Sequence, residues 1–375
     1  MSLLAHLKAF FQERYELGGL ADLFTHKSVP VHRHAFWYYW GGMTLALIGI
    51  QIASGVLLLL YYRPSAGEAF ESVRFIMTKV EFGWLIRSVH AWAAHFAIFS
   101  AMVHLASTFF LKAYRPPREL TWVSGVLLLF LLMGFGFTGY LLPWNTLAFF
   151  ATKVGTELAG IPPLVGPILQ TFMRGGSDVG DVTLTRFFWL HVAVLPLGLL
   201  GLLAGHLVMI QLQGMSTPPS ARRPEGPAPV GADPPSADAS GGGAMPFFPN
   251  FFLRDLIAWS VMLGAVLCIS VYAPATLGEK ADPFAPTPAG IQPEWYFLWM
   301  FQTLKLFPGH LFGLEGELVA VALTGLAGLA LLLVPWLDRP ARRGQSHWLT
   351  MLLGFIAVGY VVGMTGYALW IGKPH

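Results

Sequence analysis

Four histidines form two widely spaced pairs inside apolar stretches that contain no Lys, Arg, Asp or Glu. His90 and His104 are fourteen residues apart in one stretch, and His191 and His206 are fifteen apart in another. An ionisable side chain inside a membrane is costly and is usually functional. At about 100° and 1.5 Å per residue, each pair stays on one side of its helix and is separated by about 21–22 Å in depth.

These intervals predict two levels of paired imidazoles. One helix separates the two stretches, so they run in the same direction, and His90 shares one level with His191 while His104 shares another with His206. Two imidazoles at one depth can be the axial ligands of a haem iron inside a helical bundle. Because such iron has no open position, we predict electron transfer through two non-covalent b-type haems rather than oxygen activation.

Glycines repeat the same interval on two other stretches. Gly41 and Gly55 are fourteen residues apart, as are Gly125 and Gly139. A flat macrocycle pressed against a helix needs a bare patch of backbone, and two haems need two patches per helix. Either glycine pair alone is also typical of close helix packing, and a single intramembrane histidine often serves in helix contacts or a proton relay. His95 lies about 140° around the helix from His90, and we interpret it as structural.

The elements that position these residues are membrane-spanning helices. The chain is 55% apolar and only 11% charged, against roughly 25% charged in soluble domains. We predict an all-α polytopic membrane protein with a four-helix di-haem bundle and three further transmembrane helices. The seven uncharged stretches are 35–60, 88–111, 120–142, 187–213, 256–278, 318–337 and 345–372.

Four regions follow from composition. Residues 1–34 are predicted to contain an amphipathic helix on the membrane surface. Residues 35–213 form the di-haem bundle, and 250–375 form the three-helix region with a long loop. Between them, 214–249 is predicted to be a disordered linker, since 23 of the 32 residues from 214 to 245 are Pro, Gly, Ala or Ser. The first apolar run begins near residue 35, so we expect no signal peptide.

Charge and cysteine content exclude several classes. A net charge of +3 without a basic stripe gives no indication of nucleic-acid binding. The single cysteine, Cys268, excludes a disulfide framework and an iron–sulfur cluster held by this chain. An amino terminus on the inner side places 13 of the 23 Lys and Arg residues inside. The long connections after the first, third and fifth spans then lie together on the outer face.

Five motifs carry a family resemblance. They resemble the cytochrome b subunit of quinol–cytochrome c oxidoreductases of the bc and b6f type, in particular cytochrome b6 fused to its three-helix subunit IV. The motifs are "FGWLIRSVH" (82–90), "PRELTWVSG" (117–125), "TGYLLPW" (138–144), "TLTRFFWLH" (183–191) and "QPEWYFLWMFQTLK" (292–305).

The resemblance implies a catalytic membrane subunit. Quinol would be oxidised at the outer face, with one electron passing to a Rieske iron–sulfur protein and the other through the two haems to a quinone at the inner face. This would contribute to proton translocation. Expected partners are the Rieske protein, a c-type cytochrome, and a second copy in a dimeric multi-subunit complex. The expected location is a bacterial-type inner membrane.

Several residues receive site roles. Glu294 matches the family's quinol-proton acceptor, and an acid among aromatic residues suits that chemistry; a solvated loop acid is the alternative. Tyr296 and Tyr140 are candidates for lining the same site, although interfacial tyrosines often only anchor a helix. Arg87, one turn before His90, is a candidate partner for a haem propionate or an interfacial anchor.

Two positions depart from the b6 pattern. Tyr39 stands about where b6 proteins carry the cysteine that attaches a third haem, so we expect no covalent haem. Gln211 replaces an arginine that follows the last haem ligand. Asp22, His26 and Lys27 are our candidates for the inner quinone site.

Two other functions remain open from the sequence. A di-haem membrane anchor of a dehydrogenase or hydrogenase also carries intramembrane histidines, but has no role for the "PEWY" loop. A cofactor-free proton-coupled transporter could use a histidine relay, but interrupted spans and inverted repeats are not apparent.

Overall fold

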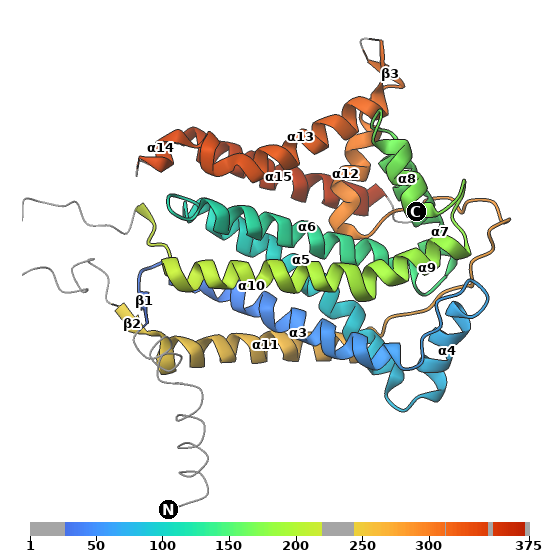
Figure 1. The fold of residues 1–375 in the computed structure, drawn as a ribbon, viewed down its shortest axis with the longest axis horizontal. Helices are drawn as coiled ribbons and strands as arrows, with labels where there is room; N and C mark the ends of the chain where they lie inside the picture. Colours follow the sequence, from blue (N-terminus) through green and yellow to red (C-terminus); the bar gives the residue numbers. More distant parts are fainter. Residues whose placement is uncertain (1–26, 220–243, 312, 344–347, 372–375) are drawn as a thin grey trace, which may run out of the picture.

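Long helices running side by side dominate this computed structural model, which describes residues 27–219, 244–311, 313–343 and 348–371 (Figure 1). Within these residues, seven helices are long and apolar enough to cross a membrane, which confirms the predicted all-α polytopic fold. They are Ala35–Leu59, Gly83–Phe110, Glu119–Leu141, Asp181–Gln213, Phe247–Tyr272, Gly316–Arg342 and Trp348–Ile371.

The first four spans form the bundle. Helix α3 (Tyr39–Leu59), which follows the short η1 (Ala35–Tyr38), packs along α5 (Gly83–Phe110). Helix α6 (Glu119–Leu141) packs against the fourth span. That span consists of α9 (Asp181–Trp189), η2 (Leu190–Val194) and α10 (Leu195–Gln213) in continuous succession.

The segment η2 is a single π turn in the fourth span, and it contains His191. Its N–H···O bond runs from Leu195 back to Leu190. A π turn holds one residue more than an α turn. The fifteen-residue interval from His191 to His206 therefore equals the fourteen-residue interval on α5 plus one inserted residue. With a uniform step of 100° per residue, fifteen residues would rotate His206 about 100° further from His191 than His104 is rotated from His90. The π turn takes up the extra residue and removes this additional rotation.

The last three spans flank the bundle on two sides (Figure 1). Helix α11 (Phe252–Tyr272), which follows η5 (Phe247–Phe251), packs against α3 and α5. On the other side α13 (Gly316–Leu337) packs against α6, and α12 (Trp295–Lys305) packs against α13 and α15 (Trp348–Ile371). The short α14 (Arg339–Arg342) follows α13.

The two ends of the bundle differ. At one end β1 (Ser28–Pro30) pairs antiparallel with β2 (Ala244–Pro246), joining the segment before the first span to the segment before the fifth. The long connections gather at the opposite end (Figure 1). They contain α4 (Ala69–Lys79), α7 (Thr146–Gly160), α8 (Gly166–Arg174), β3 (His310–Leu311) and β4 (Leu314–Glu315).

Two of the predicted regions lie partly outside the described residues. Of residues 1–34, proposed to contain a surface helix, the structure describes only 27–34, and β1 begins there at Ser28. The proposed linker 214–249 is described at its two ends, and its last residues, 244–249, form β2 and the start of η5.

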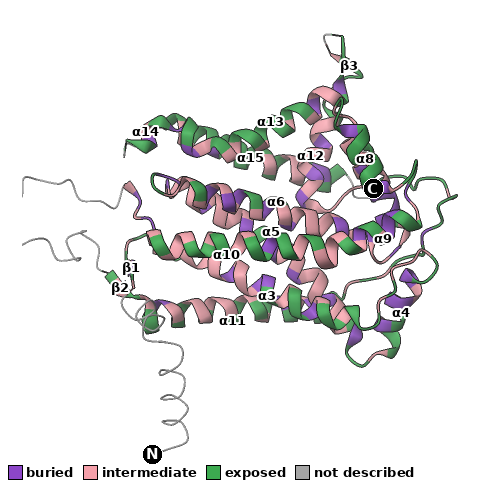
Figure 2. Cartoon of the chain, viewed as in Figure 1, coloured by how far each residue is buried: buried purple, intermediate pink, exposed green. Residues whose placement is uncertain are grey.

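Large apolar side chains cover the outer surfaces of the spans. Figure 2 shows exposed residues along α10, α11, α13 and α15. Leu197 and Leu212 on α10 and Val261 on α11 are examples. Lipid tails are as apolar as leucine, so these faces suit a bilayer.

Candidate functional site

Two pairs of histidines face each other between α5 and the fourth span. The ring centroids of His90 and His191 are 6.3 Å apart, with ring planes at 70°. Two metal–imidazole bonds of about 2 Å each fit between rings at this separation. His104 and His206 lie close enough to interact electrostatically nearer the β1–β2 end. We call these pairs the His90 level and the His104 level.

At the His90 level, two glycines lie directly against the imidazoles. A Cβ added to Gly139 on α6 would lie 2.6 Å from His191 Cε1, and one added to Gly55 on α3 would lie 3.3 Å from His90 Cε1. The first distance is shorter than real Cβ atoms adopt, so Gly139 cannot carry a side chain without displacing His191.

The His104 level repeats this arrangement. A Cβ at Gly41 on α3 would lie 3.0 Å from His104 Cε1, and one at Gly125 on α6 would lie 3.3 Å from His206 Cε1. All four glycines of the fourteen-residue pattern thus contact a histidine, one glycine for each imidazole.

A hydroxyl group fixes the orientation of His90. Ser54 Oγ lies 2.9 Å from His90 Nδ1 and 2.6 Å from the carbonyl oxygen of Ile50. Its single proton is donated to that carbonyl, so its oxygen accepts the Nδ1–H of the imidazole. The lone pair of Nε2 is then free for a metal, because the hydrogen bond at one ring nitrogen selects the tautomer.

Two further hydroxyls have the same role. Ser124 Oγ lies 2.8 Å from His206 Nδ1, and Thr138 Oγ1 lies 3.1 Å from His191 Nδ1. Each hydroxyl also donates to a carbonyl of its own helix. The sequence analysis missed these residues, although all three immediately precede a glycine of the pattern.

His104 is the exception. Its Nδ1 is buried without a hydrogen-bond partner among the described residues. Trp40 precedes Gly41 where the other three glycines follow a hydroxyl residue, and its indole Nε1 also lacks a partner there.

These features fit a haem at each level. The paired imidazoles would supply two nitrogen ligands to each iron, the hydroxyls leave three Nε2 atoms as acceptors, and the glycines remove side chains from the helices beside them. Only two protein ligands per iron are needed, since the macrocycle supplies the others.

A cleft of about 2110 Å³ opens between α6 and the helices α12, α13 and α15. It exceeds the roughly 300–1,000 Å³ of a single ligand pocket, so it is an opening between spans rather than one enclosed site. Its polar end, beside α7, is lined by Tyr140, Glu294 and Tyr296. The structure therefore brings together the three residues proposed for quinol oxidation.

Within this polar end, Tyr296 is buried and its hydroxyl lies against Gly136 of α6, where a Cβ would collide with it. Burial raises the pKa of the Glu294 carboxyl above its ordinary value. Burial, together with the charges of Glu294 and Tyr140, raises the pKa of Tyr296. A carboxyl group with a raised pKa beside an apolar cleft suits proton exchange with a neutral ligand.

Comparisons with known proteins agree with this arrangement. The family model described as cytochrome b/b6/petB matches residues 24–214, and the model described as cytochrome b (C-terminal)/b6/petD matches residues 280–373. The chain belongs to the cytochrome b/b6 family. It is the cytochrome b of a bc- or b6f-type quinol oxidoreductase, and its function is electron transfer across the membrane.

Individual relatives cover different parts of the chain. The cytochrome bc complex cytochrome b subunit of Chlorobaculum thiosulfatiphilum is 44% identical over 94% of this chain and 78% of its own length. Cytochrome b6 of Gloeobacter violaceus is 44% identical over 56% of this chain and 97% of its own. A solved structure entitled "Hyperthermophilic respiratory Complex III" matches with a TM-score of 0.82 and 29% identity, covering 98% of this chain and 91% of that one.

Arg87 lies one turn before His90 on α5 and bonds the connection after α11. Its guanidinium donates to the carbonyl oxygens of Ala275 (2.5 Å) and Thr276 (3.0 Å), in the connection after α11. In the structure it therefore joins α5 to this connection at the His90 end.

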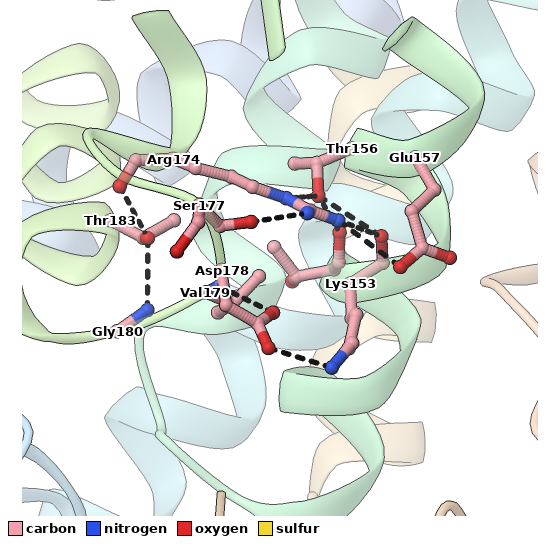
Figure 3. A network of polar contacts seen from close by, with 10 residues as sticks. Lys153, Thr156, Glu157, Arg174, Ser177, Asp178, Val179, Gly180 and Thr183 are labelled. Atoms are coloured by element: carbon pink, nitrogen blue, oxygen red, sulfur yellow. Dashed lines mark hydrogen bonds and ion pairs between the residues drawn. The ribbon is translucent and has the colours of Figure 1, made fainter. Parts of the chain in front are cut away.

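A polar network joins α8 to α7 beside the cleft. The buried guanidinium of Arg174, on α8, donates to Thr156 Oγ1 (2.7 Å) and to the carbonyl oxygens of Lys153 (2.9 Å) and Ser177 (3.1 Å) (Figure 3). An ion pair with Glu157 at 3.4 Å completes it. These contacts join α8 to α7, which lines the cleft.

The opposite end has its own polar groups. Lys27 Nζ donates to the side chain of Gln211 and to the carbonyl oxygens of Ile210 and Gln211 (both 3.3 Å). Asp255 of α11 lies against Gly42, and its buried Oδ1 has no partner among the described residues. Asp255 was missed by the sequence analysis, although it is an acid in the first turn of a span. The other candidates, Asp22 and His26, lie outside the described residues.

Proposed function

We propose that His90 and His191 ligate the iron of one b-type haem, and that His104 and His206 ligate the iron of a second. The observation that carries this is the two facing imidazole pairs, each flanked by two glycines that leave bare backbone. Two such haems, when bound, supply a path for single electrons between the two ends of the bundle.

We further propose that quinol is oxidised at the polar end of the cleft. Glu294 lines the cleft and accepts a proton from a quinol hydroxyl, while Tyr296 and Tyr140 line the same end. Because the carboxyl group must be ionised to accept a proton, the rate of quinol oxidation should rise with pH through the raised pKa of Glu294.

A quinone-reduction site at the His104 end completes the proposal. Lys27, bonded to Gln211 of the fourth span, and Asp255, against Gly42 of the first, supply a cation and an acid at this end. Such a pair can exchange protons with a quinone that receives electrons at this level.

The remaining expectations concern orientation and partners. The His90 end faces outward and the amino terminus inward, in a bacterial-type inner membrane, as the distribution of Lys and Arg predicts. A Rieske iron–sulfur protein and a c-type cytochrome accept electrons at the outer end, in a dimeric multi-subunit complex. We expect both haems to be extractable without breaking a covalent bond, so the denatured chain should not stain for haem.

Substituting Glu294→Gln in the purified complex tests the quinol site. Loss of a general base should slow quinol oxidation about tenfold or more. The dependence of the rate on pH in the range of the Glu294 pKa should disappear, while reduced-minus-oxidised spectra still show both haems. Glu279→Gln is the matched control, because Glu279 is an exposed acid of the same connection and does not line the cleft. Equal rates in Glu294→Gln and the control at every pH would contradict the assignment.

A further inference from the structure

His95 contacts the quinol-site loop rather than either histidine pair. Its Nδ1 accepts a hydrogen bond from the indole Nε1 of Trp295 at 3.2 Å, and the same atom lies 4.0 Å from Glu294 Oε2. The His95 ring also lies 6.3 Å from the ring of Tyr296. The sequence analysis correctly places His95 away from the His90 face, but its interpretation as structural does not use these contacts.

Glu294 stands between the cleft and His95. The cleft is lined by Glu294, Trp295 and Tyr296, but not by His95. A quinol in the cleft therefore meets the carboxyl group first, and the imidazole lies on its other side. Both side chains are partly exposed, 28% for His95 and 26% for Glu294, so neither is sealed inside the protein.

The hydrogen bond from Trp295 defines the state of the imidazole. An indole N–H can only donate, so Nδ1 of His95 carries a lone pair and Nε2 carries the hydrogen. A protonated Nδ1 could no longer accept from Trp295, and the Glu294 carboxylate 4.0 Å away would become its partner. The same atom thus has one partner for the neutral ring and another for the imidazolium.

We propose that His95 relays the proton that Glu294 takes from quinol, a role that rests on the function proposed above for Glu294. The quinol O–H bond breaks as the carboxyl O–H bond of Glu294 forms. That bond then breaks as an N–H bond forms at His95 Nδ1, leaving a carboxylate and an imidazolium. The imidazolium then releases its Nε2 proton toward the aqueous phase, and transfer of the remaining proton from Nδ1 to Nε2 restores the tautomer that accepts from Trp295. Glu294 takes the proton of the second quinol hydroxyl by the same route, so that two protons leave each quinol while its two electrons go to the acceptors already proposed.

The surrounding groups are compatible with this transfer. Tyr296 of α12 and Tyr140 of α6 are the phenols that interact with Glu294, and burial raises the pKa of Tyr296, so its phenol stays protonated. On α5 itself, Arg87 is directed to the Ala275 and Thr276 carbonyls. Trp92, also on α5, donates its Nε1–H at 2.8 Å to the carbonyl of Ala273, in the connection after α11, and offers His95 no charge.

The test is His95→Asn in the purified complex. The Asn Oδ1 can still accept from Trp295 but cannot carry a proton onward. We expect quinol oxidation to slow by about tenfold at pH 8 with both haems retained. The rates of the parent protein and of His95→Asn should approach each other as pH falls, because a protonated His95 in the parent protein cannot accept a proton either. His310→Asn, at an exposed position of β3, is the control.

A double-substitution cycle separates this inference from the proposed function. If His95 acts through Glu294, His95→Asn should cause no further slowing in the Glu294→Gln background. A His95→Asn variant equal to the control at every pH, or one that slows Glu294→Gln by a further tenfold, overturns the relay while Glu294 keeps its role. A Glu294→Gln variant with unchanged turnover overturns the proton-acceptor assignment itself.

Discussion

The His90 and His104 levels are built from the same parts but are supported differently. Each has two imidazoles and two glycines. At the His90 level both Nδ1 atoms bond a hydroxyl, from Ser54 and Thr138. At the His104 level only His206 has such a partner, and His104 Nδ1 has none among the described residues. The difference shows that ligand position can repeat along a bundle while the groups that orient the ligands do not.

The largest expected effect tests whether the levels are independent. Replacing His191 by Ala should remove the haem of the His90 level and leave the other, because under the proposed ligation only one iron would lose a ligand. A pyridine haemochrome assay should then find about half the haem of the parent protein. His95→Asn is the control and should retain both haems. Full haem content in His191→Ala would contradict the pairing.

A buried ion pair stabilises the His104 end of the bundle. At the His104 end, Lys112 Nζ lies 2.7 Å from Asp338 Oδ2, and both side chains are almost fully buried. Tyr114 donates to the same carboxylate oxygen at 2.6 Å. Lys112→Met leaves that carboxylate unpaired and should cost about 3–5 kcal/mol of stability.

Thermal unfolding of the purified complex measures this effect. Tyr114→Phe is the matched comparison and should cost only about 1 kcal/mol, because the carboxylate keeps its cation. Equal unfolding midpoints for Lys112→Met and the parent protein would show that the ion pair does not stabilise this end.

A glycine substitution sharpens the comparison inside one level. A Cβ at Gly139 meets His191 at 2.6 Å, whereas a Cβ at Gly55 meets His90 at 3.3 Å. Gly139→Ala should therefore displace its histidine and lower the haem content of the His90 level, while Gly55→Ala should be tolerated after a shift of a few tenths of an ångström. Redox titration of the haem spectrum would identify the affected level; equal losses in both variants would argue against the close contact.

The smallest expected effect concerns the hydroxyls. Ser54→Ala removes the acceptor of His90 Nδ1 and should weaken haem retention by about 10–100-fold, the usual cost of losing a partner of a metal-ligating histidine. Trp40→Phe, at the corresponding position of the His104 level, removes an indole N–H that has no partner in the described part of the chain and should change retention little. Rates of haem transfer to apomyoglobin measure both. Equal rates of haem transfer from Ser54→Ala and Trp40→Phe would contradict the proposed difference between the two levels.

The sequence predicted the repeated features well and the single ones poorly. Seven spans followed from composition, and the fourteen-residue intervals identified the glycines that the structure places against the imidazoles, since helical periodicity links spacing to direction. The π turn at His191 was not predicted, because an inserted residue leaves no mark on apolar composition. Ser54, Ser124 and Thr138 were missed because short hydroxyl residues are common in membrane helices for packing alone.

Two side chains show what spacing cannot decide. Arg87 is predicted to be a partner for a haem propionate or an interfacial anchor, and the spacing did not reveal that its guanidinium donates to carbonyls 188 and 189 residues away in the chain. His95 meets Trp295 across 200 residues. Contacts this distant depend on how the connection after α11 folds back over α5.

By itself, the sequence determined that this chain crosses the membrane as seven helices and that two pairs of its histidines are each separated by about four helical turns. Those properties depend on local composition and on the geometry of a single helix. Only the tertiary structure decided which hydroxyl holds each imidazole, that the three spans after the linker divide between two sides of the bundle, and that Glu294 stands between a cleft and His95. Those relations join distant segments, and the free energy of packing them together, rather than any local preference, selects them.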